Sequence, residues 1–187
     1  MGLLIVIALI FAVFFAGIVI YNQLVKYSFL VKEAWAGIDV QLKRRHDLIP
    51  SLVESAKGYA KYEQGVFEKV TSLRAEIVNA KNNKQASGLE NDLSRAIKSI
   101  FLVAENYPNL KASQNFIDLQ KNISLVEDNI QMARRYYNGT VRDYNVAIQS
   151  FPGVVIANLF RFSPIDFFEI EYSTERNSPD VEFGSKQ

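Results

Sequence analysis

The side chains of this chain that could carry chemistry are few and lie far apart. His46 is the single histidine and there is no cysteine, so a metal site built from several imidazoles or thiolates is excluded. The other candidates are two arginine pairs and three separate carboxylates: Arg44-Arg45, Arg134-Arg135, Asp39, Glu63 and Glu127. Carboxylates this scattered do not indicate a catalytic pair, and no nucleophile, base and orienting group form a recognisable set. We therefore expect no cofactor and no enzymatic activity.

His46 is followed directly by Asp47 and, four positions after the histidine, by Pro50. This order resembles the phosphoacceptor helix of sensor kinases, in which the proline usually lies five positions after the histidine. The shifted proline argues against phosphotransfer, as does a sequence that offers no second domain to bind ATP. We expect His46 to be an exposed or capping residue near a break in a helix.

The two arginine pairs are short basic patches that could bind phosphate or lipid headgroups. Arg45, however, falls on the apolar stripe of its own helix, as does Glu63. Charges on such a stripe need partners, so a buried ion pair or one at a subunit interface is the more economical interpretation. The candidate interface or headgroup residues are Arg44, Arg45, Glu63, Arg134 and Arg135.

The stripe that contains Arg45 predicts a long helix. It begins with four apolar residues at steps of four, three and four: Val31, Trp35, Ile38 and Leu42. This spacing is typical of a helix that packs along one seam, and the register continues to Ile77. It predicts one very long helix over residues 31–77, or two nearly collinear helices, with a kink or a restart at Pro50.

Two further helices follow a predicted loop over residues 79–87, which Gly88 closes. Apolar residues recur at helical spacing over 89–104, and the charges around them, Glu90 included, have the pattern of a solvated face. An unbroken stripe over 116–148 predicts the third helix, whose length makes it the natural partner of the first. Leu42 and Ile130 are the seam residues for which we expect a core position.

The first residues predict a membrane anchor. No charged side chain precedes Lys26, and twenty-one helical residues span roughly 30 Å, about one hydrocarbon core. A cleaved signal peptide usually has a basic start and a shorter apolar run, so we expect a retained transmembrane helix. Ala8, Ala12 and Ala16 lie on one face of it and permit close approach of helices in lipid.

Several short motifs make the whole pattern recognisable. They are Tyr21-Asn22, Ala34-Trp35, residues 38–45, residues 47–50, Gly58-Tyr59, Tyr107-Pro108, residues 134–138, Tyr144-Asn145 and Phe151-Pro152. Over residues 21–152 the chain resembles the LemA family of bacterial membrane-anchored proteins. The resemblance implies an N-terminal anchor and a helical bundle, but no general biochemical activity.

The orientation in the membrane has two indications that disagree. The basic residues near the span all follow it: Lys26, Lys32, Lys43, Arg44 and Arg45. The positive-inside rule therefore favours a cytoplasmic domain. Some LemA-like proteins carry a lipoprotein-type cysteine where this apolar helix ends, which implies a domain outside the cytoplasm. We follow the resemblance and expect the domain on the extracytoplasmic face of the bacterial cytoplasmic (inner) membrane.

These observations predict an all-α protein in which an N-terminal transmembrane helix is followed by an antiparallel bundle of long helices. The expected parts are an anchor over 1–25, the bundle over 26–160 and an irregular C-terminal tail over 161–187. The net charge of +1, from 21 basic and 20 acidic residues, does not suggest nucleic-acid binding. The tail carries three aromatic residues that could plug the bundle, enter the membrane interface or contact a neighbouring subunit: Phe162, Phe167 and Phe168.

The expected function is that of a non-enzymatic structural or interaction protein, a self-associating scaffold in membrane organisation. Its expected partners are the lipid bilayer, further copies of itself in a closed ring of parallel subunits, and an unidentified membrane protein. The alternative is an accessory or regulatory subunit of a membrane protease, enzyme or signalling system.

Overall fold

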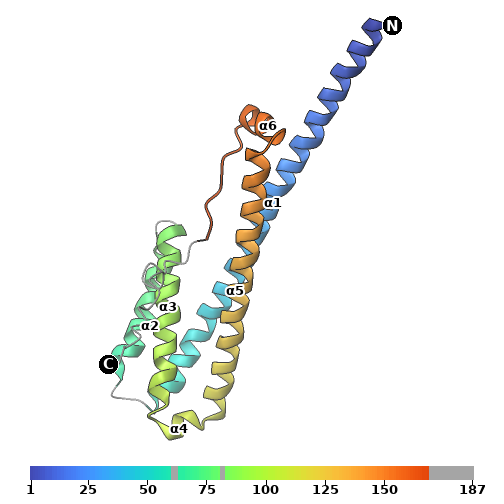
Figure 1. The fold of residues 1–187 in the computed structure, drawn as a ribbon. Coiled ribbons are helices and arrows are strands. Elements are labelled where there is room, and N and C mark those ends of the chain that lie inside the picture. The colour runs from blue at the N-terminus through green and yellow to red at the C-terminus, as the bar shows by residue number, and fades with distance from the viewer. Residues whose placement is uncertain (60–62, 81–82, 169–187) are drawn as a thin grey trace, which may run out of the picture.

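The structure is a computed structural model, and it describes residues 1–59, 63–80 and 83–168. In this part of the chain all regular secondary structure is helical, which confirms the predicted all-α class. The elements are α1 (Gly2–Lys57), α2 (Gln64–Val78), α3 (Asn83–Ala104), α4 (Pro108–Lys111), α5 (Gln114–Gln149) and α6 (Gly153–Phe160). The long helices α1 and α5 lie side by side along most of the molecule, and α1 extends beyond α6 toward the N-terminus (Figure 1).

Helix α1 is continuous over 56 residues, so the restart, one of the two alternatives at Pro50, does not occur. Pro50 lies on the exposed side of the helix. There, water can satisfy the carbonyl group that loses its donor to the proline ring. At 1.5 Å per residue the helix is roughly 84 Å long, and it joins the apolar N-terminal stretch to the bundle without a hinge.

The expected collinear helix over residues 31–77 is wrong. Helix α1 ends at Lys57, and α2 runs back along the bundle, where it packs against α3 and the end of α1 (Figure 1). Lys57, Gly58 and Tyr59 are all exposed, although Tyr59 falls on the predicted stripe. The connection between the helices happens to preserve the heptad register, so the spacing alone could not distinguish a straight helix from a hairpin.

The loop expected over residues 79–87 is also largely helix. Helix α3 begins at Asn83, and Gly88, which was expected to close the loop, lies inside α3. A Cβ atom at Gly88 would have no neighbour within 4 Å, so packing does not require the glycine. The cost of a glycine inside a helix, about 1 kcal/mol, is small against the burial of the apolar face of α3.

Two apolar clusters fill the bundle. The proximal cluster, nearer the N-terminal stretch, joins α1, α5 and α6 and includes Leu24, Ile38, Tyr144 and Ala157. The distal cluster joins α1, α2, α3 and the start of α5 and includes Leu52, Phe67, Ile100 and Phe116. Ile130 is fully buried as expected, whereas Leu42 is only partly buried at the edge of the proximal cluster. A straight helix drifts relative to a strict heptad, which moves Leu42 off the centre of the seam.

After α6 an extended segment, Phe162–Phe168, lies along α5 and is held by side-chain amides. Asn145 donates to the carbonyl of Ile165 at 2.8 Å and accepts from its amide at 3.0 Å. Asn138 forms the same two bonds with Phe168, at 3.1 and 2.8 Å. The first part of the expected tail is therefore fixed to the bundle, and residues 169–187 lie outside the described residues.

Gly153 allows α6 to pack closely against the end of α5, and this close approach can be tested. A Cβ atom at position 153 would lie 2.1 Å from the carbonyl oxygen of Ala147. We expect Gly153→Ala to lower the free energy of unfolding by about 1–3 kcal/mol, because the backbones must move apart. The matched control is Gly139→Ala in α5, where a Cβ meets nothing within 4 Å. Alanine there should stabilise the helix by up to about 1 kcal/mol.

Thermal melts of the full-length protein in mild detergent, followed by circular dichroism, measure both variants. Melting temperatures that shift in the same direction for the two variants would contradict the close approach at Gly153.

Candidate functional site

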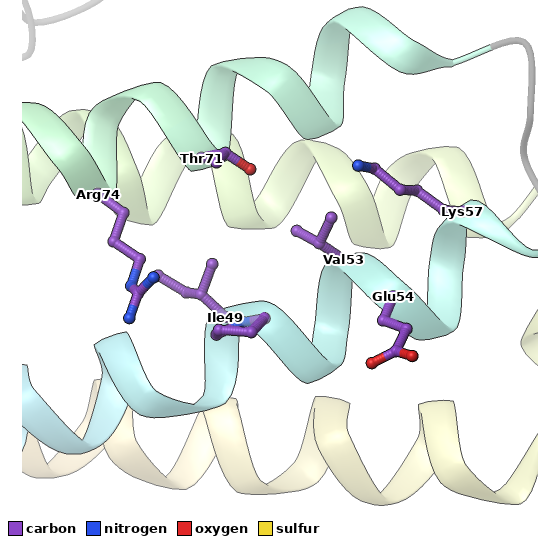
Figure 2. Close-up of a pocket in the computed structure, with 7 residues that line it drawn as sticks. Ile49, Val53, Glu54, Lys57, Thr71 and Arg74 are labelled. Carbon is purple, nitrogen blue, oxygen red and sulfur yellow. The ribbon is translucent and has the colours of Figure 1, made fainter.

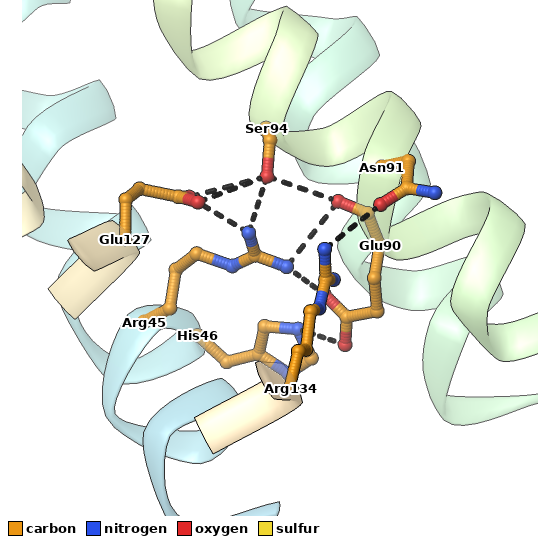
Figure 3. Close-up of polar contacts among 7 residues, drawn as sticks. All are labelled: Arg45, His46, Glu90, Asn91, Ser94, Glu127 and Arg134. Atoms are coloured by element: carbon orange, nitrogen blue, oxygen red, sulfur yellow. Dashed lines mark hydrogen bonds and ion pairs between the residues drawn. The ribbon is translucent and has the colours of Figure 1, made fainter. Parts of the chain in front are cut away.

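A layer of polar and charged side chains crosses the bundle between the two apolar clusters (Figure 3). We call it the charge layer. Helix α1 contributes Arg45 and His46, α3 contributes Glu90, Asn91 and Ser94, and α5 contributes Glu127 and Arg134.

Arg45 is the centre of the charge layer and is completely inaccessible to solvent. Its Nη1 donates to Glu127 Oε1 at 2.7 Å and to the hydroxyl of Ser94. Its Nη2 forms an ion pair with Glu90 Oε2 and lies 3.3 Å from the backbone carbonyl oxygen of Glu90. One guanidinium therefore joins all three long helices, with a carboxylate on each side (Figure 3).

Glu90 is 2% exposed and has a second partner, since His46 Nε2 lies 3.0 Å from its Oε1. Burial by itself raises the pKa of the Glu90 carboxyl. The contact with His46 and the charge of Arg45 outweigh burial, and the pKa is held below its usual value. Glu90 is therefore a carboxylate in the folded protein, and its charge is balanced inside the bundle.

Arg134 connects the charge layer to the extended segment. Its side chain is 4% exposed, and Nη1 lies 3.2 Å from the side-chain oxygen of Asn91. The guanidinium carbon stands 4.5 Å from the ring centroid of Phe168, a cation–π contact. Phe168 also packs near Trp35, with ring centroids 6.0 Å apart. The described end of the chain is thus held by a residue of the same layer.

The structure separates the candidate residues that the sequence grouped together. Arg45 and Arg134 are buried, whereas Arg44 and Arg135, their neighbours in the chain, are exposed. Glu63 is half-buried at the start of α2, and the carboxylates that pair with Arg45 are Glu90 and Glu127 instead. Ala8, Ala12 and Ala16 are exposed on the N-terminal half of α1.

Sequence reasoning placed Glu90 on a solvated face, and this was wrong. The signal that could have found it is its spacing from the buried residues of α3. Glu90 precedes Leu93, Ile97, Ile100 and Ala104 at steps of three, four, three and four, so it lies on the apolar stripe. Arg45 and Arg134 also lie on the buried stripes of their helices. A charge on the stripe of each of several helices indicates a shared polar layer.

The chemistry of the charge layer is that of mutual neutralisation. Ser94 Oγ lies 3.2 Å from both carboxylate oxygens of Glu127, a serine beside a potential base. The guanidinium of Arg45 contacts both groups, so the carboxylate of Glu127 is already engaged in an ion pair. Among the residues that the structure describes, no group of three or more acidic, histidine or cysteine side chains could hold a metal ion. A cation between Glu90 and Glu127 would also have to displace Arg45.

A pocket of about 360 Å³ lies between the end of α1 and α2 (Figure 2). Its lining combines apolar and charged side chains: Ile49, Pro50, Val53, Glu54, Lys57, Thr71 and Arg74. The Thr71 hydroxyl donates to the carbonyl of Phe67 at 2.9 Å, as is usual for a threonine in a helix. The hydroxyl proton of Thr71 is therefore directed at the backbone of its own helix and not into the pocket.

Comparison with known proteins agrees with the resemblance. The model of the LemA family matches residues 34–183, which include every member of the charge layer. The chain belongs to the LemA family. It is 26% identical to Protein LemA of Metamycoplasma hominis over 165 residues, 83% of this chain and 75% of that protein.

A second relative is the magnetosome protein MamQ of Magnetospirillum gryphiswaldense, 21% identical over 174 residues. The match covers 79% of this LemA-family chain and 64% of MamQ, so the chain spans less than two thirds of that protein. The N-terminal part of α1 is long and apolar enough to cross a membrane, and its most apolar window is 0% buried in the structure. The chain is thus a LemA-family protein with a candidate membrane helix.

Replacing Arg45 tests the role of the charge layer. Arg45→Met removes the cation that pairs with Glu90 and Glu127 while keeping much of the side-chain volume. We expect the free energy of unfolding to fall by about 3–5 kcal/mol, because a buried carboxylate loses its partner. Arg44→Met is the matched control: Arg44 is exposed, and its loss should change stability by less than about 0.5 kcal/mol.

Denaturant titrations of the full-length protein in mild detergent measure both arginine variants. Adding Glu90→Gln to Arg45→Met should restore part of the loss, since it removes the unpaired charge. Equal effects of the Arg44 and Arg45 variants would mean that the charge layer does not stabilise the bundle.

The lowered pKa of Glu90 predicts a dependence of stability on acid pH. A carboxyl whose pKa is lower in the folded than in the unfolded state stabilises the fold above its unfolded pKa. That contribution disappears as the pH falls through the folded pKa. We therefore expect the free energy of unfolding to decrease below about pH 4.5, the ordinary pKa of the group. Glu90→Gln should show a shallower decrease in the same titration, and an identical slope would contradict the assignment.

Proposed function

We propose that this LemA-family protein is a non-enzymatic scaffold that associates with copies of itself at the bacterial cytoplasmic membrane. Helix α1 crosses the bilayer once, and the bundle lies on the extracytoplasmic face. The protein organises the membrane by assembling parallel subunits, and its charged residues serve the fold rather than a reaction.

The observation that carries this proposal is an apolar stripe on the outer face of α5. Leu125, Met132, Tyr136 and Val146 are each 51–56% exposed. At 100° per residue they fall within a sector opposite the residues that α5 buries, such as Ile130. The stripe is not continuous, because the exposed residues Asp128 and Asp143 fall in the same sector. Large apolar side chains gathered on one exposed face still support a surface that another protein covers.

Helix α1 supports the same interpretation. Phe29 and Val40, both 63% exposed, lie eleven residues apart and so on one face, also directed away from the bundle. In the N-terminal half, Ala8, Ala12 and Ala16 are exposed at four-residue spacing and permit close packing of two helices in lipid. Subunits that cross a membrane in the same sense form a closed assembly by rotation about an axis normal to it.

One argument for self-association fails. Arg45 lies on the apolar stripe of its helix and could have needed a partner from another subunit, but Glu90 and Glu127 of the same chain pair with it. The proposal therefore rests on the exposed apolar surfaces.

Sedimentation velocity of the full-length protein in mild detergent tests the proposal. We expect a discrete multimer that dissociates when Met132 and Tyr136 are both changed to Glu, because two charges would enter the interface. Changing Ala12 and Ala16 to Leu should weaken it as well. Leu102→Glu is the matched control, since Leu102 is 70% exposed and belongs to α3 and not to α1 or α5.

A monomer at every accessible concentration would refute the scaffold. A stable complex with one copy of a different membrane protein would favour an accessory subunit instead.

A further inference from the structure

Helix α6 exposes the residues that a helix in water normally buries. Val155 is 56% exposed, Leu159 71% and Phe160 54%, and Phe151 just before the helix is 84% exposed. The buried side of α6 is made of small residues, Gly153 and Ala157. The helix is therefore fastened to the bundle by its small face and presents its bulky apolar face outward, against the usual preference for burying large side chains.

The position of α6 along α1 suggests what covers this face. The rings of Tyr21 and Phe160 are 4.6 Å apart, and those of Tyr21 and Phe162 are 5.9 Å apart. A Cβ atom at Gly17 would lie 3.7 Å from Cδ1 of Ile156. Helix α6 thus packs beside the last turns of the uncharged stretch that ends before Lys26. If that stretch spans the hydrocarbon core, α6 lies at the boundary between acyl chains and headgroups.

The apolar surface of α1 reaches the level of α6. Ile18 and Val19, which follow Gly17 in the chain, are 42% and 50% exposed. Helix α6 also lies at the level where α1 leaves the bundle (Figure 1). An apolar surface that continues from a membrane span at this depth is suited to lipid acyl chains.

The charges around α6 suit a lipid surface. No acidic residue occurs between Phe151 and Ile165. Arg161 follows the helix directly as its C-cap, in the left-handed conformation with φ of 58°, and is exposed. An arginine at the end of an interfacial helix can hold its guanidinium among phosphate groups while its stem lies along acyl chains.

We propose that α6 is an interfacial membrane helix: its exposed face, Phe151, Val155 and Leu159, inserts into the bilayer beside α1, Phe160 lies between α6 and Tyr21, and Arg161 contacts lipid phosphates. The bundle then has two attachments to the membrane, the span of α1 and the short helix α6. This inference requires that α1 crosses the membrane, but it does not require that the protein self-associates.

The chain has no cysteine, so single-cysteine variants can carry a nitroxide label at one position. Val155→Cys and Leu159→Cys report on α6. Val13→Cys reports on the apolar stretch, and Leu102→Cys reports on an exposed site in the last turn of α3, which leads to α4. The full-length variants are reconstituted in vesicles of phosphatidylethanolamine and phosphatidylglycerol. Power saturation of the spin label then compares its collisions with oxygen, which concentrates in lipid, and with a water-soluble nickel chelate.

We expect collisions with oxygen to exceed those with nickel at positions 155 and 159, as at 13, and the reverse at 102. Nickel-dominated collisions at both α6 positions would place the helix in water and overturn the proposal. Low access to both reagents, with spectral broadening from a nearby label, would show that a second copy covers α6 and would overturn it too. If changing Ala12 and Ala16 to Leu dissociates the multimer but leaves the ratio of oxygen to nickel collisions at positions 155 and 159 unchanged, the insertion of α6 is supported independently of the scaffold.

Discussion

The burial of Arg45 is the constraint on which the rest of the bundle depends. A guanidinium without access to water needs partners for its charge, and here Glu90 and Glu127 supply two carboxylates, although Nε of Arg45 has no hydrogen-bond partner among the described residues. These residues come from three different helices. A shift of one helix by a single turn would place a charge against an apolar cluster, so the layer specifies one register for α1, α3 and α5. The apolar clusters on either side supply most of the stabilisation but little of this specificity.

The extended segment after α6 likewise depends on partners that another part of the chain supplies. Its backbone groups have no helix or sheet to pair with, and α5 supplies side chains instead. Asn138 and Asn145 lie seven residues apart, roughly 10.5 Å along a helix. Ile165 and Phe168, which they bind, lie three residues apart, roughly 10 Å along an extended chain. Because the two repeats match, one face of α5 can hold the segment at two points, with Tyr137 and Tyr144 adding bonds to its carbonyls.

The features that could be predicted from the sequence depend on single helices, and most of those that could not depend on how several elements meet. The all-α class and α5 followed from apolar periodicity, which depends only on the residues of one element. The turn after Lys57 could not be predicted, because heptad spacing is the same for a straight helix and a hairpin whose connection keeps the register. The pairing of Arg45 depends on which helices meet, and the docking of Phe162–Phe168 has no periodicity. Glu90 was the avoidable error, since its spacing already placed it on the apolar stripe of α3.

These features bear on how the bundle can be oriented at a membrane. A continuous α1 transmits any tilt of its N-terminal half to the bundle, because no hinge intervenes before Lys57. The close contact of Gly153 with α5 and the ring contacts of α6 with Tyr21 tie α5 to the same level of α1. If α6 lies in the interface, as proposed, it fixes both the height of the bundle above the bilayer and the tilt of α1. The outer stripe of α5 then lies at a fixed angle to the bilayer. Proposed self-association would then be confined to copies in one membrane plane, since only these present their stripes at the same height.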